Sequence, residues 1–166
     1  MHHASHHDHS SAPRAPASLS TTAFWATVHC LSGCAVGEVL GMVLGTGFGL
    51  SNGVTIALSI VLAFVFGYAF TVTPLLRSGM AAKTAAGIAL GADTASIALM
   101  ELVDNLVMMV WPGAMDAGLT DSLFWVALAV SLLIAGAAAF PLNRFLISRG
   151  KGHALVHAHH GHAGHH

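Results

Sequence analysis

Four apolar segments, each close to the length of a membrane-spanning helix, constrain this chain more than any other feature. A helix needs about 20 mainly apolar residues to cross the hydrocarbon core of a bilayer. Short connections that contain Gly, Pro, Asn and Ser separate the segments, and these residue types are typical of turns. We place the segments at residues 22–44, 54–72, 84–110 and 122–145.

The composition supports this interpretation. Hydrophobic residues make up 55% of the 166-residue chain and charged residues only 8%, whereas a soluble domain carries about 25% charged residues. We therefore predict an all-α integral membrane bundle of four transmembrane helices in residues 21–150, with the lipid bilayer as its solvent. A net charge of -1 gives no basic patch for nucleic acid.

The positively charged residues predict the orientation of the bundle, because they collect on the cytoplasmic side of membrane proteins. The connections after the first and third segments contain neither Lys nor Arg. All six cations fall on the other side of a four-span protein: Arg14, Arg77, Lys83, Arg144, Arg149 and Lys151. We expect a multi-pass protein of a bacterial inner (cytoplasmic) membrane with both termini in the cytoplasm.

Glycines recur at every fourth position of the first segment, at Gly33, Gly37, Gly41 and Gly45. Such spacing forms a smooth stripe on which a second helix backbone can approach closely. The stripe predicts helix packing through the first segment. We expect that this packing includes the formation of a homo-oligomer.

A second stripe on the first segment carries the polar residues Cys30, Cys34 and Glu38, with His29 next to it. Thiolates favour Cu(I), and imidazole suits copper and zinc. These four residues predict a soft-metal site for copper, or alternatively zinc, to which other helices or another subunit would add ligands. The alternative is that the cysteines are small packing residues. Because neighbouring helix positions point about 100° apart, His29 is poorly placed to activate Cys30, and we expect no enzyme.

The third segment carries an acidic face. Asp93, Glu101 and Asp104 lie within about 80° of one another on a helical wheel, and Asn105 lies beside them. Charged residues at membrane depth are expensive and usually serve a function. No Lys or Arg within the segments neutralises these acids, so they predict an ion path that carries protons or holds a cation. The alternative is that protonated carboxyls only form hydrogen bonds between helices.

Twelve of the thirteen histidines lie in the two ends of the chain, residues 1–20 and 151–166. Short His-rich tracts are a compositional signal of metal binding. Interleaved Gly, Ala and Ser imply no fixed geometry, so we expect disordered tails that buffer metal ions. A purely solubilising role is the alternative.

Two sequence cores carry a family resemblance. One is Phe24–Glu38, with its His-Cys and Gly-Cys pairs; the other combines Ala92–Thr94 with Met100–Asn105. Together they resemble the DUF4396 family of bacterial membrane proteins over roughly residues 22–157. The resemblance implies a small multi-span membrane protein. The family has no assigned function and supplies no site residues.

Three hypotheses for the function follow. The first is a protein that handles or transports a soft metal ion, most plausibly copper. The second is a proton or cation channel or relay that uses the carboxylates without the thiols. The third is an interaction or assembly protein in which the glycines and buried acids only fix the packing.

Overall fold

The computed structural model describes residues 18–149, apart from the side chain of Ala92. Within that range the chain forms four long α-helices and one 3-10 turn: α1 (Leu19–Gly47), α2 (Asn52–Arg77), α3 (Ala82–Val110), η1 (Ala114–Asp116) and α4 (Ser122–Ser148). The predicted all-α fold is confirmed. The predicted tails, their histidines, Arg14 and Lys151 lie outside the described residues.

Three of these helices, α1, α2 and α4, are each long and apolar enough to cross a membrane. Helix α3 meets the same test as a bent pair, Ala82–Gly91 and Asp93–Val110, with 44° between the two parts. The chain is therefore a multi-pass membrane protein with three candidate spans, or four if α3 counts as one.

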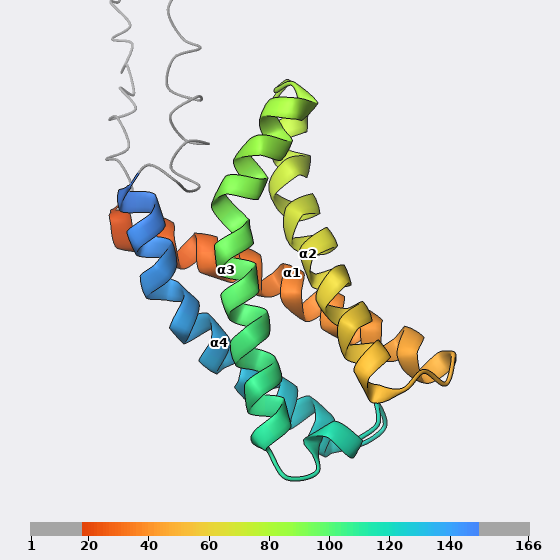
Figure 1. The fold of residues 1–166 in the computed structure, drawn as a ribbon. Coiled ribbons are helices and arrows are strands. Elements are labelled where there is room, and N and C mark those ends of the chain that lie inside the picture. The colour runs from red at the N-terminus through yellow and green to blue at the C-terminus, as the bar shows by residue number, and fades with distance from the viewer. Residues whose placement is uncertain (1–17, 150–166) are drawn as a thin grey trace, which may run out of the picture.

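The helices have 26 to 29 residues, which gives each a length of about 39–44 Å at 1.5 Å per residue. They exceed the hydrocarbon core of about 30 Å, and such helices usually tilt. Figure 1 shows this arrangement: α2 and α3 form a steep hairpin, and α1 crosses behind α3 at a large angle.

The helix ends agree with the local sequence. Asp121 caps the start of α4, where its carboxylate accepts a hydrogen bond from the Leu123 N–H at 2.9 Å, as Asp commonly does at this position. Helix α3 ends at Val110, the last residue of the predicted segment, and Gly113 takes the positive φ of 77° that the following turn needs.

Helix α2 is longer than the predicted segment, which ended at residue 72. It continues through Pro74 to Arg77. Proline lacks an N–H, but its carbonyl still accepts a helical hydrogen bond from the Ser78 N–H at 3.1 Å. One further helical turn therefore forms, and Pro74 does not end the helix.

The glycine stripe of α1 packs against α2 of the same chain. A Cβ atom added to Gly33 would lie 2.7 Å from the Gly67 Cα, closer than side-chain atoms can approach. Gly37, Gly41 and Gly45 meet α2 in the same way, against Ala63, Ser59 and Thr55. The stripe is thus occupied within the chain and is not the surface on which a second copy would dock. Association of copies stays a prediction.

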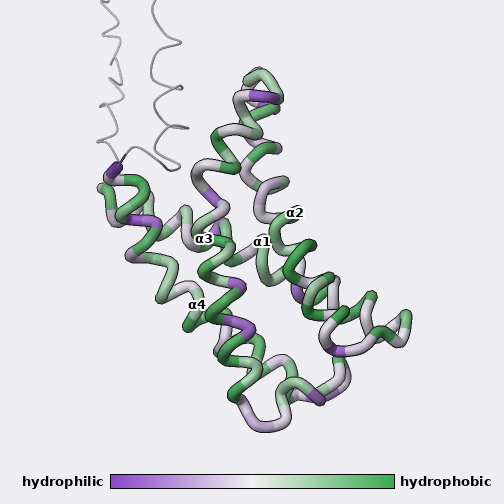
Figure 2. The backbone as a smooth tube through the Cα atoms, in the orientation of Figure 1, coloured by the Kyte–Doolittle hydropathy of each residue, from purple (hydrophilic) through white to green (hydrophobic). Residues whose placement is uncertain are grey.

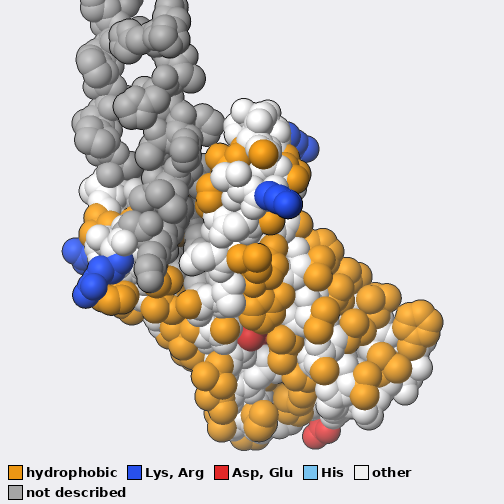
Figure 3. All heavy atoms as spheres, turned by 45° about the horizontal axis from the view of Figure 1, so that its top comes forward, with side chains coloured by type: hydrophobic (Ala, Val, Ile, Leu, Met, Phe, Trp, Pro, Cys, Tyr) orange, Lys and Arg blue, Asp and Glu red, His pale blue; other side chains and the backbone are white. Residues whose placement is uncertain are grey.

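The surface divides into a cationic end and an apolar remainder. Figure 3 shows apolar side chains over most of one face, with Lys and Arg confined to one end. In the part of the chain that the structure describes, these cations are Arg77, Lys83, Arg144 and Arg149. Figure 2 shows that hydrophilic positions nevertheless recur along the middle of α3.

Candidate functional site

The acids and thiols predicted from the sequence all lie in the interior of the bundle. Their side chains are 6% exposed or less, and they come from α1 and α3. The set comprises Cys30, Cys34, Glu38, Asp93, Glu101 and Asp104. The inward orientation of both polar faces is therefore confirmed.

One group of side chains joins α1, α2 and α3. The Cys30 thiol donates a hydrogen bond to Asp93 Oδ1 at 3.8 Å. His29 Nε2 lies 3.2 Å from Thr71 Oγ1, and both His29 and Thr71 interact with the Asp93 carboxylate. A half-buried imidazole thus lies beside the carboxylate, which gives this acid a neighbour able to carry positive charge.

A second contact lies one turn farther along α1. Cys34 lies close enough to Glu101 for the thiol and the carboxyl group to interact electrostatically. It also lies close to Cys30 on its own helix, and both cysteines are free thiols. The two thiols therefore lie between Asp93 and Glu101.

Glu38 and Asp104 form a carboxyl pair between α1 and α3. Their carboxyl groups lie close enough to interact electrostatically, and Ser131 of α4 donates a hydrogen bond to Asp104. Glu101 also lies near both acids. Two carboxylates that lie this close repel each other when both are charged. A proton or another cation at the pair would relieve this repulsion.

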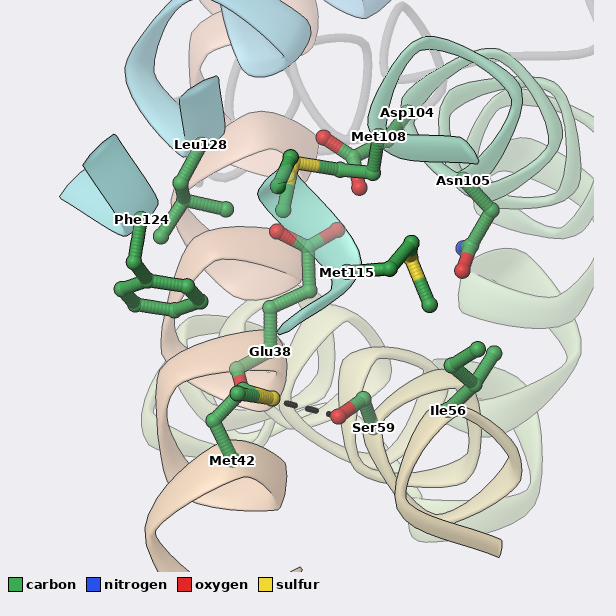
Figure 4. A pocket seen from close by; sticks show the side chains of 11 residues that line it. Glu38, Met42, Ile56, Ser59, Asp104, Asn105, Met108, Met115, Phe124 and Leu128 are labelled. Atoms are coloured by element: carbon green, nitrogen blue, oxygen red, sulfur yellow. Dashed lines mark hydrogen bonds between the residues drawn. The ribbon is translucent and has the colours of Figure 1, made fainter. Parts of the chain in front are cut away.

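The carboxyl pair borders a cavity of about 70 Å³. All four helices and η1 contribute to its wall, and the thioethers of Met42, Met108 and Met115 line it. Figure 4 shows the Glu38 carboxyl group pointing into this space among the methionines. A cavity needs only about 10–15 Å³ of such space for one water molecule, so this one has room for several.

The predicted set of metal ligands is not assembled into one site. His29 and Cys30 lie with Asp93, Cys34 with Glu101, and Glu38 with Asp104. In residues 18–149 no group of three or more His, Cys, Asp and Glu side chains is placed to hold a metal ion. Copper or zinc at His29, Cys30, Cys34 and Glu38 thus stays a prediction without support from the geometry.

The sequence interpretation missed several polar partners. Ser131 is the donor to Asp104, and Ser96 is fully buried on the same face of α3 as the acids. In the sequence, Ser131 stands out only as a hydroxyl residue in the middle of an apolar segment. Asn105, predicted to join the ion path, donates to the Glu101 carbonyl and lines the cavity.

Comparison with known proteins identifies the chain by family alone. Neither a curated protein nor a solved structure matches it. A family model described as a domain of unknown function, DUF4396, matches residues 21–152 and so covers the four helices apart from the first two residues of α1. The chain therefore belongs to the DUF4396 family, in agreement with the resemblance carried by its Cys/Glu and acidic cores.

Proposed function

We propose that this protein is a proton relay within a bacterial inner membrane. The observation that carries the proposal is a series of neighbouring titratable side chains in the bundle interior. The series runs from His29 and Asp93 through Cys30 and Cys34 to Glu101, and then to the Asp104–Glu38 pair.

The chemistry of each member suits proton transfer. Carboxyl and imidazole groups take up and release protons, and a thiol both donates and accepts weak hydrogen bonds. Rows of Asp, Glu and His inside membrane helices are the usual components of proton pathways in pumps and transporters. The thiols extend the relay across the gap between Asp93 and Glu101, which carboxylates alone leave open.

The surroundings of Glu38 and Glu101 favour a role in moving a cation, such as a proton, over a purely structural role for these two acids. The groups that interact with Glu38 are themselves acids, Asp104 and Glu101. No N–H or O–H group of the described residues donates to the carboxylate oxygens of Glu38 or Glu101. Acids that served only to join helices would be expected to have such donors, because an unsatisfied buried polar group costs about 1–3 kcal/mol.

The positions of the cations indicate which end of the relay lies at the cytoplasmic side of the membrane. Arg77, Lys83, Arg144 and Arg149 lie at the ends of helices, on the same side of the predicted spans. By the positive-inside rule this end faces the cytoplasm. The Glu38–Asp104 pair and its cavity then lie toward the opposite side of the membrane.

The test is proton flux in proteoliposomes that contain the purified full-length protein, driven by a pH gradient. Glu101→Gln and Asp104→Asn keep the size of each side chain but cannot exchange a proton. We expect flux to fall at least tenfold in each, which corresponds to a barrier higher by about 1.4 kcal/mol. Asp116→Asn is the matched control, since Asp116 is exposed in η1. Wild-type flux in both interior variants would refute the relay.

A further inference from the structure

The cavity beside the carboxyl pair has a chemical character that a proton relay does not require. Three of the seven methionines of the chain, Met42, Met108 and Met115, line it together. They come from α1, α3 and the η1 turn, so three separate elements bring three thioether sulfurs to one space. Met42 and Met108 also pack in the same apolar cluster around Phe124.

A buried carboxyl group faces the same space. Glu38 is 6% exposed, and neither of its carboxylate oxygens accepts a hydrogen bond from an N–H or O–H group of residues 18–149. Its carboxyl group points into the cavity between Met108 and Met115 (Figure 4). A buried carboxylate of this kind favours a cation near it, because opposite charges attract strongly where water is scarce.

Thioether sulfur is a soft, uncharged ligand that binds Cu(I) and related soft ions and has little affinity for Mg²⁺, Ca²⁺ or Na⁺. We propose that the cavity is a binding site for a soft monovalent cation of the Cu(I) and Ag(I) class. Met42, Met108 and Met115 supply the sulfur ligands, and Glu38 supplies the compensating charge once the bound cation displaces its proton. Of the four metal ligands predicted from the sequence, this site keeps Glu38 and replaces the Cys and His residues with methionines.

A second cavity adjoins the site, toward the end of the bundle opposite the cations. A neighbouring cavity of about 90 Å³ shares Met42, Ile56 and Met115 with the first. It continues to Leu50 and Asn52 at the exposed turn between α1 and α2. The methionines therefore border a second cavity that lies toward the surface, and the thiols do not line either cavity. The proposal does not depend on proton conduction through the interior series.

Methyl NMR of the full-length protein in detergent, labelled with ¹³C at the methionine methyl groups, tests the proposal during a titration with Ag(I). Methionine resonances report on thioether binding even though the histidines of the chain ends also take up silver. We expect the resonances of Met42, Met108 and Met115 to shift together and to saturate, while that of Met109 stays in place. Met109 is the matched control, since it is adjacent to Met108 but 62% exposed.

Two kinds of variant sharpen the test. Met108→Leu and Met115→Leu nearly preserve side-chain volume, so the fold is expected to tolerate them. Each should remove the Ag(I)-induced shift of the other two cavity methionines, whereas Met109→Leu should leave it intact. Glu38→Gln should weaken Ag(I) binding severalfold. Unchanged cavity resonances at silver saturation, or shifts of equal size at Met109, would overturn the proposal.

Discussion

At the scale of single residues, the titratable groups in the interior differ in the side chains that surround them. Asp93 has His29, Thr71 and Cys30 beside it, so hydroxyl, thiol and imidazole groups compensate its charge. Glu38 has other acids as neighbours. One end of the series therefore has polar groups that stabilise its carboxylate, and the other end is suited to a mobile proton or a bound cation.

Residue types predicted which side chains face inward, but not how they group. Helical periodicity placed Asp93, Glu101 and Asp104 on one face, and the structure buries all three. Three different acids of α3 lie beside His29, Cys30, Cys34 and Glu38. Which acid each of these residues meets depends on how α1 and α3 are aligned along their axes. Periodicity within one helix contains no information on that alignment.

At the scale of helices, the contact between α1 and α2 depends on matched small residues. The α1 glycines face Thr55, Ser59, Ala63 and Gly67, which also recur at every fourth position and are buried. Close packing of backbones provides van der Waals contact in a bilayer, where the hydrophobic effect does not drive helices together.

Gly37→Ala should destabilise this contact. The new Cβ would lie 2.7 Å from the Leu62 carbonyl carbon and closer still to the Ala63 backbone, which cannot move as a flexible side chain can. We expect a loss of about 1–3 kcal/mol, typical of overpacking. Thermal unfolding in detergent measures it. Gly87→Ala is the control, since nothing lies within 4 Å of its added Cβ, and equal stability of the two variants would contradict the packing account.

The sequence predicted the number and order of these helices well, because apolar length is a strong signal. The partner of the glycine stripe could not be predicted, since a stripe of small residues fits either a second copy or a neighbouring helix. The complementary stripe of α2 carried the missing information. Its period of four, from Thr55 to Thr71, was present in the sequence.

At the scale of the whole molecule, the account predicts an orientation. A single cysteine introduced at Gly118, between α3 and α4, should face the outside of the cell, and one at Ala82, at the start of α3, the cytoplasm. Both positions are exposed, while the native Cys30 and Cys34 are buried and should not react. In right-side-out membrane vesicles, a membrane-impermeant maleimide should label only Gly118→Cys. Labelling of Ala82→Cys alone would invert the proposed topology.

The interior series crosses the molecule only if the two thiols connect its acids, and proton flux in paired cysteine variants tests this central claim most directly. Cys30→Ser with Cys34→Ser keeps a hydrogen-bonding group at both positions, while Cys30→Ala with Cys34→Ala removes both. In proteoliposomes under a pH gradient, we expect the serine pair to conduct protons and the alanine pair to lose most of the flux. Wild-type flux through the alanine pair would contradict the account, because the acids of α3 would then exchange protons without the thiols.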